Sequence, residues 1–218
     1  MNPMRYTLVA DGPSDRCLLR FINSVLEGIP GLAESGFVSQ FAGPSETRVD
    51  QPGLGARLHQ AVRFFPCDLL FVHRDAERDP IEHRREEIRR ASSEGGLPLL
   101  VPLIPVRMTE AWLLIDAHAI RRAADNPNGS VPLAMPRIAD LEFLPDPKQT
   151  LFDLLVLASE KKGRRLGQFR TVQSLSWRRA RVAELIQDLS PLSFLSAFAG
   201  FRSETLITVD RWLESKQG

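Results

Sequence analysis

Short apolar runs alternate with amphipathic segments through the first half of the chain. Four runs predict buried strands: RYTLVA at 5–10, GFVSQFA at 36–42, CDLLFVH at 67–73 and LPLLVPLIPV at 97–106. Between them, helical spacing of apolar residues predicts one helix with its N-cap at Ser14 and others over about 53–64 and 79–91. This alternation is typical of an α/β fold, with a mostly parallel sheet and helices on both faces.

The second half of the chain carries a different pattern. Helical spacing predicts helices over 109–124, with a break near Asp116, and over 148–161, 174–188 and 203–215. Prolines and the Asn-Pro-Asn-Gly segment at 126–129 separate them. We therefore expect an α/β core over residues 1–116 and a mainly helical C-terminal extension or subdomain, packed on the core, over 117–218.

Composition narrows the class of protein. The 218 residues are 43% hydrophobic and 25% charged, which is typical of a globular protein with a sizeable core. A net charge of +1 is too small for the protein as a whole to attract nucleic acid or a membrane, so any basic surface must be local. Two cysteines, Cys17 and Cys67, predict neither a disulfide framework nor a zinc site. No apolar run reaches the roughly 18 residues that span a bilayer, so we expect a soluble cytoplasmic protein without a membrane partner.

Charged residues follow three of the predicted strands, where a parallel sheet gathers functional groups at its carboxyl edge. The first strand ends at Asp11. The third strand ends in the sequence His73, Arg74, Asp75, Ala76, Glu77, and the fourth leads to Arg107 and Glu110. Carboxylates that share an edge repel one another, so a divalent cation such as Mg²⁺ or Mn²⁺ is the natural partner.

We assign roles to these residues on that basis. Asp11, Asp75 and Glu77 are the predicted metal ligands, and Asp11, His73, Asp75 and Glu110 are the predicted catalytic groups. Each has a structural alternative. Asp11 before Gly12 is also a common turn former, His73 a common core residue, and Glu110 a favourable charge at a helix start.

A basic stretch lies in the second half, between Glu160 and Glu184, with no acidic residue inside it. Trp177 lies among its cations, and such a combination suits contact with phosphates and stacking on an unpaired base. The alternative is a solvated basic helix. The predicted nucleic-acid contacts are Arg74, Arg107, Lys161, Lys162, Arg164, Arg165, Arg170, Arg178, Arg179 and Arg181.

Three segments resemble motifs of Toprim domains. LVADGPSD is similar to the first motif, DLLFVHRDAE occupies the place of the Asp-x-Asp motif, and IPVRMTEAWLLID is similar to a Glu-Ala-Trp-Leu-Leu-x-Asp segment of small bacterial Toprim-like proteins. These proteins are related to overcoming-lysogenization-defect nucleases and phage-defence effectors. Two positions depart from the pattern: Asp11 stands near the place of the usual glutamate, and His73 replaces the first aspartate of the pair.

The resemblance implies a Toprim/Rossmann-like sheet and a Mg²⁺- or Mn²⁺-dependent nuclease acting on DNA or RNA, in phage defence or DNA repair. It also implies an ATPase partner protein, and the chain itself lacks the phosphate-binding loop that ends in Gly-Lys-Ser/Thr. Two alternatives stay open: a non-catalytic Toprim-like partner-binding or regulatory subunit, and a small-molecule phosphotransferase. Whether the chain forms a homodimer is also open.

Overall fold

The computed structural model describes residues 2–33, 35–44, 53–77, 79–93 and 95–217, which form two compact units. The first unit contains residues 1–104 and 197–218, and the second contains residues 105–196. This division differs from the expected boundary at 116. The chain leaves the first unit after Ile104, and the last helix returns to the first unit instead of belonging to a C-terminal extension.

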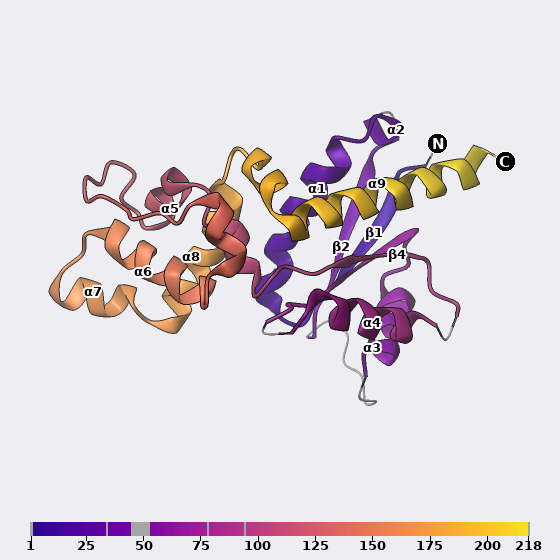
Figure 1. The fold of residues 1–218 in the computed structure, drawn as a ribbon, viewed down its shortest axis with the longest axis horizontal. Helices are drawn as coiled ribbons and strands as arrows, with labels where there is room; N and C mark the ends of the chain where they lie inside the picture. The colour runs from indigo at the N-terminus through magenta and orange to yellow at the C-terminus, as the bar shows by residue number, and fades with distance from the viewer. Residues whose placement is uncertain (1, 34, 45–52, 78, 94, 218) are drawn as a thin grey trace. The chain divides into compact units, whose positions relative to one another are not determined.

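The first unit is built on a parallel sheet, as the sequence predicted. Within the described residues, the sheet has four strands in the order β2-β1-β3-β4 (Figure 1). They are β1 (Met4–Val9), β2 (Phe37–Ala42), β3 (Leu69–His73) and β4 (Leu99–Leu103). All three pairings are parallel, and Val9 of β1 lies opposite Val72 of β3. The carboxyl ends of the two central strands therefore lie side by side.

Helices α1 (Leu18–Glu27) and α9 (Ser196–Gln217) cover one face of the sheet (Figure 1). On this face the Tyr6 ring meets the edge of Phe71 at a centroid distance of 5.2 Å, and Phe71 in turn lies 6.0 Å from Phe201 of α9. The Tyr6 hydroxyl donates a hydrogen bond to Asn23 of α1, and burial raises the pKa of Tyr6 above its usual range. These aromatic contacts explain why the C-terminal helix belongs to the first unit.

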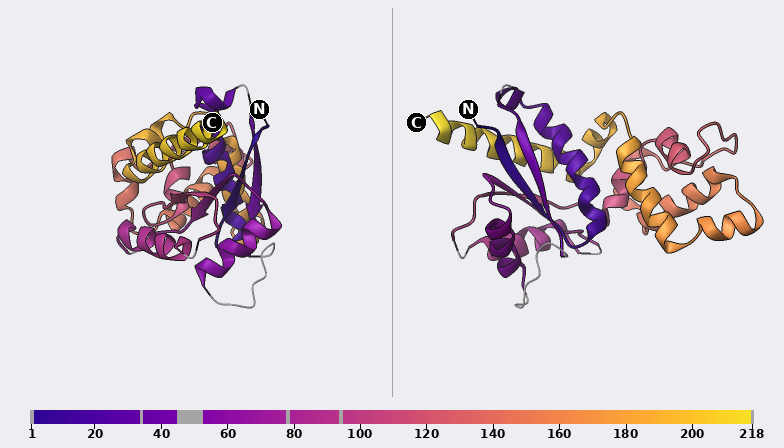
Figure 2. Two further views of the ribbon diagram at one scale, coloured as in Figure 1. Left: turned by 90° about the vertical axis from the view of Figure 1, so that its right-hand side faces the viewer. Right: turned by 180° about the vertical axis from the view of Figure 1, so that it is seen from behind.

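Helices α3 (Leu54–Phe64) and α4 (Ile81–Ser92) cover the opposite face of the sheet (Figure 2). Val9 and Val72 pack there in one buried cluster with Leu58 of α3 and Ile88 of α4. Burial of such side chains stabilises each by about 1.5–3 kcal/mol. The expectation of helices on both faces is confirmed.

The second unit is helical. A 3₁₀ turn, η2 (Thr109–Leu113), is followed by α5 (Ala117–Ala123), and Asp116 caps α5 by accepting a hydrogen bond from the Ala119 N–H at 3.0 Å. The break predicted near Asp116 is thus a helix start. The remaining elements of the unit are η3 (Ile138–Phe143), α6 (Pro147–Ser159), α7 (Gly163–Phe169), α8 (Val172–Leu185) and η4 (Ser190–Phe194). Among the described residues, no helix is both long and apolar enough to cross a membrane.

Candidate functional site

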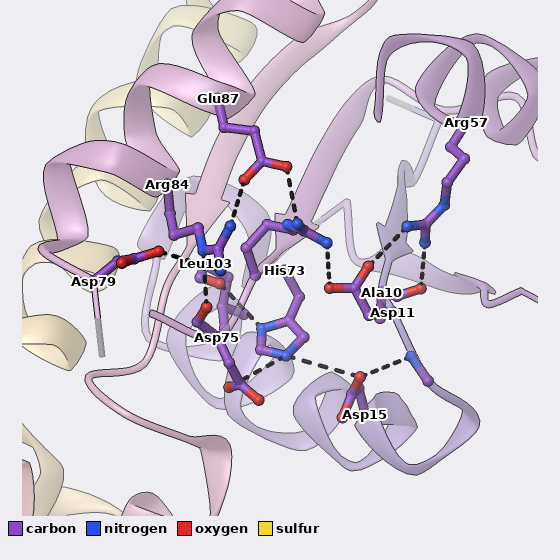
Figure 3. Close-up of polar contacts among 12 residues, drawn as sticks. Ala10, Asp11, Asp15, Arg57, His73, Asp75, Asp79, Arg84, Glu87 and Leu103 are labelled. Atoms are coloured by element: carbon purple, nitrogen blue, oxygen red, sulfur yellow. Dashed lines mark hydrogen bonds and ion pairs between the residues drawn. The ribbon is translucent and has the colours of Figure 1, made fainter. Parts of the chain in front are cut away.

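The candidate site lies at the carboxyl edge of the sheet, which we define as the C-terminal ends of β1 and β3 (Figure 3). After β1 the chain forms a 3₁₀ turn, η1 (Pro13–Cys17), and α1 begins only at Leu18. The predicted N-cap at Ser14 is wrong: the N-cap is Gly12, two residues earlier, because Pro13 has the backbone geometry that suits a first helical position. The shift places Asp15 inside the turn, where its Oδ2 accepts a hydrogen bond from the Gly12 N–H at 3.0 Å.

Two arginines hold the carboxylate of Asp11. Nη1 of Arg57, from α3, donates to Oδ1 at 2.7 Å, and Nη1 of Arg74, at the end of β3, donates to Oδ2 at 2.6 Å. Arg57 also donates from Nη2 to the Ala10 carbonyl at 2.7 Å. The Asp11 side chain is 40% exposed. Asp11 is therefore at the predicted edge, but arginine side chains balance its charge.

Glu87 of α4 links Arg74 to a further arginine, Arg84. Its two carboxylate oxygens accept hydrogen bonds from Arg74 Nη2 at 2.9 Å and from Arg84 Nη1 at 3.0 Å. Arg84 Nε donates to the Asp75 carbonyl at 3.2 Å. Within the described part of the chain, the buried Nε of Arg74 has no hydrogen-bond acceptor. Arg74 thus bridges Asp11 and Glu87 and retains one donor that neither carboxylate uses.

His73 lies between two carboxylates at the same edge, and we call Asp15, His73 and Asp75 the His73 cluster (Figure 3). Nδ1 of His73 lies 3.1 Å from the Leu103 carbonyl, which can only accept, so Nδ1 carries the hydrogen. Nε2 therefore faces Asp15 Oδ2 at 3.8 Å and Asp75 Oδ1 at 3.6 Å. The imidazole is only 2% exposed. The buried ring is fixed with its second nitrogen directed at both acids.

The predicted metal ligands Asp11, Asp75 and Glu77 are not gathered in one group. In the described ranges, no set of three His, Cys, Asp or Glu residues has the arrangement of a metal-holding group. Glu77 is exposed, with a left-handed backbone at φ 55°, and Asp11 is paired with arginines. Mg²⁺ sites commonly use only one or two carboxylates together with water and phosphate. The acids nearest to His73, Asp15 and Asp75, therefore offer at most a pair of carboxylates at this edge.

Glu110 belongs to the second unit, where it has a clear structural partner. Its Oε1 lies 2.7 Å from Nε of Arg179, and the two side chains are 6% and 5% exposed. A buried carboxylate requires such a countercharge. The pair connects η2, which contains Glu110, to α8, which contains Arg179. It therefore holds these two elements of the second unit together.

The basic stretch divides into buried and exposed residues. Arg178 and Arg179 are buried, and Arg178 pairs with Asp125 at 2.7 Å, so neither guanidinium can contact a polyanion as predicted. Their positions fall on the packed face of α8, and ion pairs satisfy their charges. Arg181 is exposed but pairs with Glu184 at 2.7 Å. Arg107 is half-buried with a left-handed φ of 64°. Lys162, Arg164, Arg165 and Arg170 are exposed.

Sequence reasoning gave no functional role to several residues that the structure brings to the edge. Asp15 follows Asp11 by four residues, across the turn, and the sequence favours for it a charge near the helix N-terminus over a ligand role. Arg57, Arg84 and Glu87 lie on predicted helices among many similar charges, and no local pattern distinguishes them. Their selection depends on tertiary packing of α3 and α4 against the sheet.

Comparison of the chain with protein-family models, with curated proteins and with solved structures found no match. The fold itself is a parallel α/β sheet of order 2-1-3-4, which is compatible with Toprim-like and Rossmann-like folds.

The buried ion pair of the second unit predicts a large stability effect. Glu110→Gln leaves the Arg179 charge buried without its carboxylate, so we expect a loss of about 3 kcal/mol in the free energy of unfolding. Urea titration followed by fluorescence of the buried Trp112 measures it. Glu184→Gln, which removes an exposed pair on the same helix, is the control and should cost less than about 1 kcal/mol. Equal small losses in both variants would contradict a structural role for Glu110.

Proposed function

We propose that the carboxyl edge is the active site of a divalent-metal-dependent phosphodiesterase that acts on nucleic acid, DNA or RNA. The observation that carries the proposal is the His73 cluster, in which two carboxylates and an imidazole nitrogen face one another beside a row of arginines. Carboxylates and imidazole suit a divalent cation, and guanidinium groups suit phosphate oxygens. The Toprim-like motifs at the same strand ends support this function.

Asp75 and Asp15 would hold Mg²⁺ or Mn²⁺ together with water and phosphate oxygens, and Nε2 of His73 faces both carboxylates. When bound, the cation would neutralise charge on the phosphate and stabilise the attacking or leaving oxygen. The hydrogen bond from Nδ1 to the Leu103 carbonyl fixes the tautomer and the orientation of the ring. His73, in place of an aspartate, lowers the negative charge of the set by one.

Arg57 and Arg74 would bind the phosphate. Both guanidinium groups now hold the Asp11 carboxylate, whose two oxygens stand in for two phosphate oxygens. A phosphate that takes this place displaces Asp11 from at least one arginine, and the unpaired Nε of Arg74 offers a further donor. The released Asp11 carboxylate is then close to the phosphate and able to accept or return a proton during hydrolysis.

A second candidate is a non-catalytic Toprim-like subunit that binds a partner. The specific observation in its favour is the position of Asp11, whose carboxylate forms ion pairs with both Arg57 and Arg74. In this function the edge is a stable charge network and Asp11 has no proton to transfer. An ATPase partner and a role in phage defence or DNA repair, which the motifs imply, are compatible with either candidate.

The first test is metal binding. Mn²⁺ should bind the wild type in calorimetric titration and raise its melting temperature by mass action, because only the folded chain assembles the His73 cluster. Asp75→Asn removes one ligand charge and should abolish both effects. Asp79→Asn is the matched control, since Asp79 is more than half exposed, pairs weakly with Arg84 at 3.7 Å, and lies outside the cluster. Absence of Mn²⁺ binding at millimolar concentration would contradict the metal-dependent function.

The second test separates the two candidate functions. Asp11→Asn keeps the volume and turn-forming ability of the side chain, and its exposed ion pairs contribute little, so stability should change by about 1 kcal/mol or less. Metal-dependent cleavage of single-stranded and plasmid substrates should fall about 100-fold or more. Glu77→Gln, an exposed neighbour of the edge, should cleave normally. A folded Asp11→Asn variant with full activity would remove Asp11 from the mechanism, and a wild type inert toward all polynucleotides would favour the non-catalytic subunit.

A further inference from the structure

The three tryptophans of the chain differ sharply in exposure. Trp112 is 0% exposed and Trp212 is 4% exposed, whereas Trp177 of α8 is 58% exposed. Val172, at the start of the same helix, is 80% exposed. The residues that pack α8 into its unit are others, such as Leu175, Val182 and Leu185. Packing therefore gives no reason for a large indole ring at position 177.

The cations next to this ring in the sequence, Arg178 and Arg179, have acidic partners, but in the described part of the chain those of α7 and its flanking residues do not. Within the described residues, Lys162, Arg164, Arg165 and Arg170 are exposed and form no ion pair, in contrast to Arg181, which pairs with Glu184. All four belong to α7 or its flanking residues. The charge of this segment is thus available to an external anion. We call these four cations together with Val172 and Trp177 the Trp177 surface.

Side-chain contacts connect Trp177 to α7. The guanidinium carbon of Arg178 lies 5.5 Å from the centre of the Trp177 ring and 4.1 Å from the centre of the Phe169 ring, at the end of α7. Nζ of Lys161 lies 5.5 Å from the same Phe169 ring. Arg178 is itself held by its ion pair with Asp125 and by a hydrogen bond to the Ala123 carbonyl. The Arg178 side chain, which these two contacts hold in place, therefore packs against both the Trp177 indole and Phe169 of α7.

We infer that the Trp177 surface binds single-stranded nucleic acid, with an unpaired base stacked on the Trp177 ring and the neighbouring phosphates held by the cations of α7. The inference rests on the proposed function, because it names single-stranded nucleic acid as the substrate class. A duplex hides its base faces, so an exposed ring on a rigid support selects for strands whose bases are free. Arginine and lysine side chains without protein partners supply the sequence-independent phosphate contacts.

Intrinsic fluorescence tests the stacking directly, because Trp177 is the exposed tryptophan and the other two are buried. In EDTA, which prevents metal-dependent cleavage, titration with an oligothymidylate should quench and shift the emission of the wild type. Trp177→Phe should show little quenching yet bind a labelled oligonucleotide nearly as well, since phenylalanine still stacks. Trp177→Ala should weaken binding by about 5- to 150-fold. Phe194→Ala, which removes an aromatic ring 81% exposed in the same unit, is the control and should bind normally.

The phosphate contacts have their own signature. In the double variant Arg164→Gln with Arg165→Gln, affinity should depend less steeply on salt. The negative slope of log affinity against log salt should shrink in magnitude by about 0.7 for each phosphate that the protein no longer neutralises. Quenching by a blunt duplex equal to that by a single strand, quenching by anionic lipid vesicles but not by oligonucleotides, or an unchanged affinity in Trp177→Ala would each overturn the inference. Asp75→Asn distinguishes the two proposals, because it should abolish cleavage and leave the quenching intact. Quenching without cleavage in the wild type would overturn the proposed function alone.

Discussion

The parallel, in-register pairing of β1 with β3 is the constraint on which the site depends. Because Val9 lies opposite Val72, the residues that follow each strand leave the sheet at the same level. Asp11 thereby meets Arg74 at 2.6 Å, and His73 reaches Asp15 and Asp75. A shift of one residue in this register would turn these side chains to the opposite faces and separate them. The buried aliphatic and aromatic layers on both faces fix that register.

Charge at the carboxyl edge is balanced by alternation of arginines and acids. Arg74 bridges Asp11 and Glu87, and Arg84 joins Glu87 to the backbone of Asp75. Each arginine of this network contacts an acidic side chain, so the charges at the edge compensate one another. A phosphate or metal ion, as proposed for this edge, would have to displace existing ion pairs, so the free energy of its binding would be reduced by the pairs that are lost. The His73 cluster lies beside the network, and its side chains would have to rearrange to hold a cation together.

The strands and the parallel sheet could be predicted from the sequence, because continuous apolar runs that alternate with helical segments are compatible with few folds other than a parallel α/β sheet. The sequence places Asp11, His73 and Asp75 at the carboxyl edge, since each follows or ends a buried strand, and their functional role stays a prediction. Arg57 and Glu87 could not be found, because helix packing selects them. In the basic stretch, by contrast, the sequence assigned a binding role to two residues that are buried. Arg178 and Arg179 resemble their exposed neighbours in the sequence, and only their burial against α5 and η2 distinguishes them.

Diffraction from crystals soaked in Mn²⁺ tests the central claim most directly, because anomalous scattering locates the ion without assumptions about activity. Our account predicts one strong anomalous peak at the His73 cluster, within about 2.0–2.3 Å of a carboxylate oxygen of Asp15 or Asp75. It also predicts that Asp11 and the two arginines next to it stay paired until phosphate is added. An edge without a peak at millimolar Mn²⁺ would contradict the account.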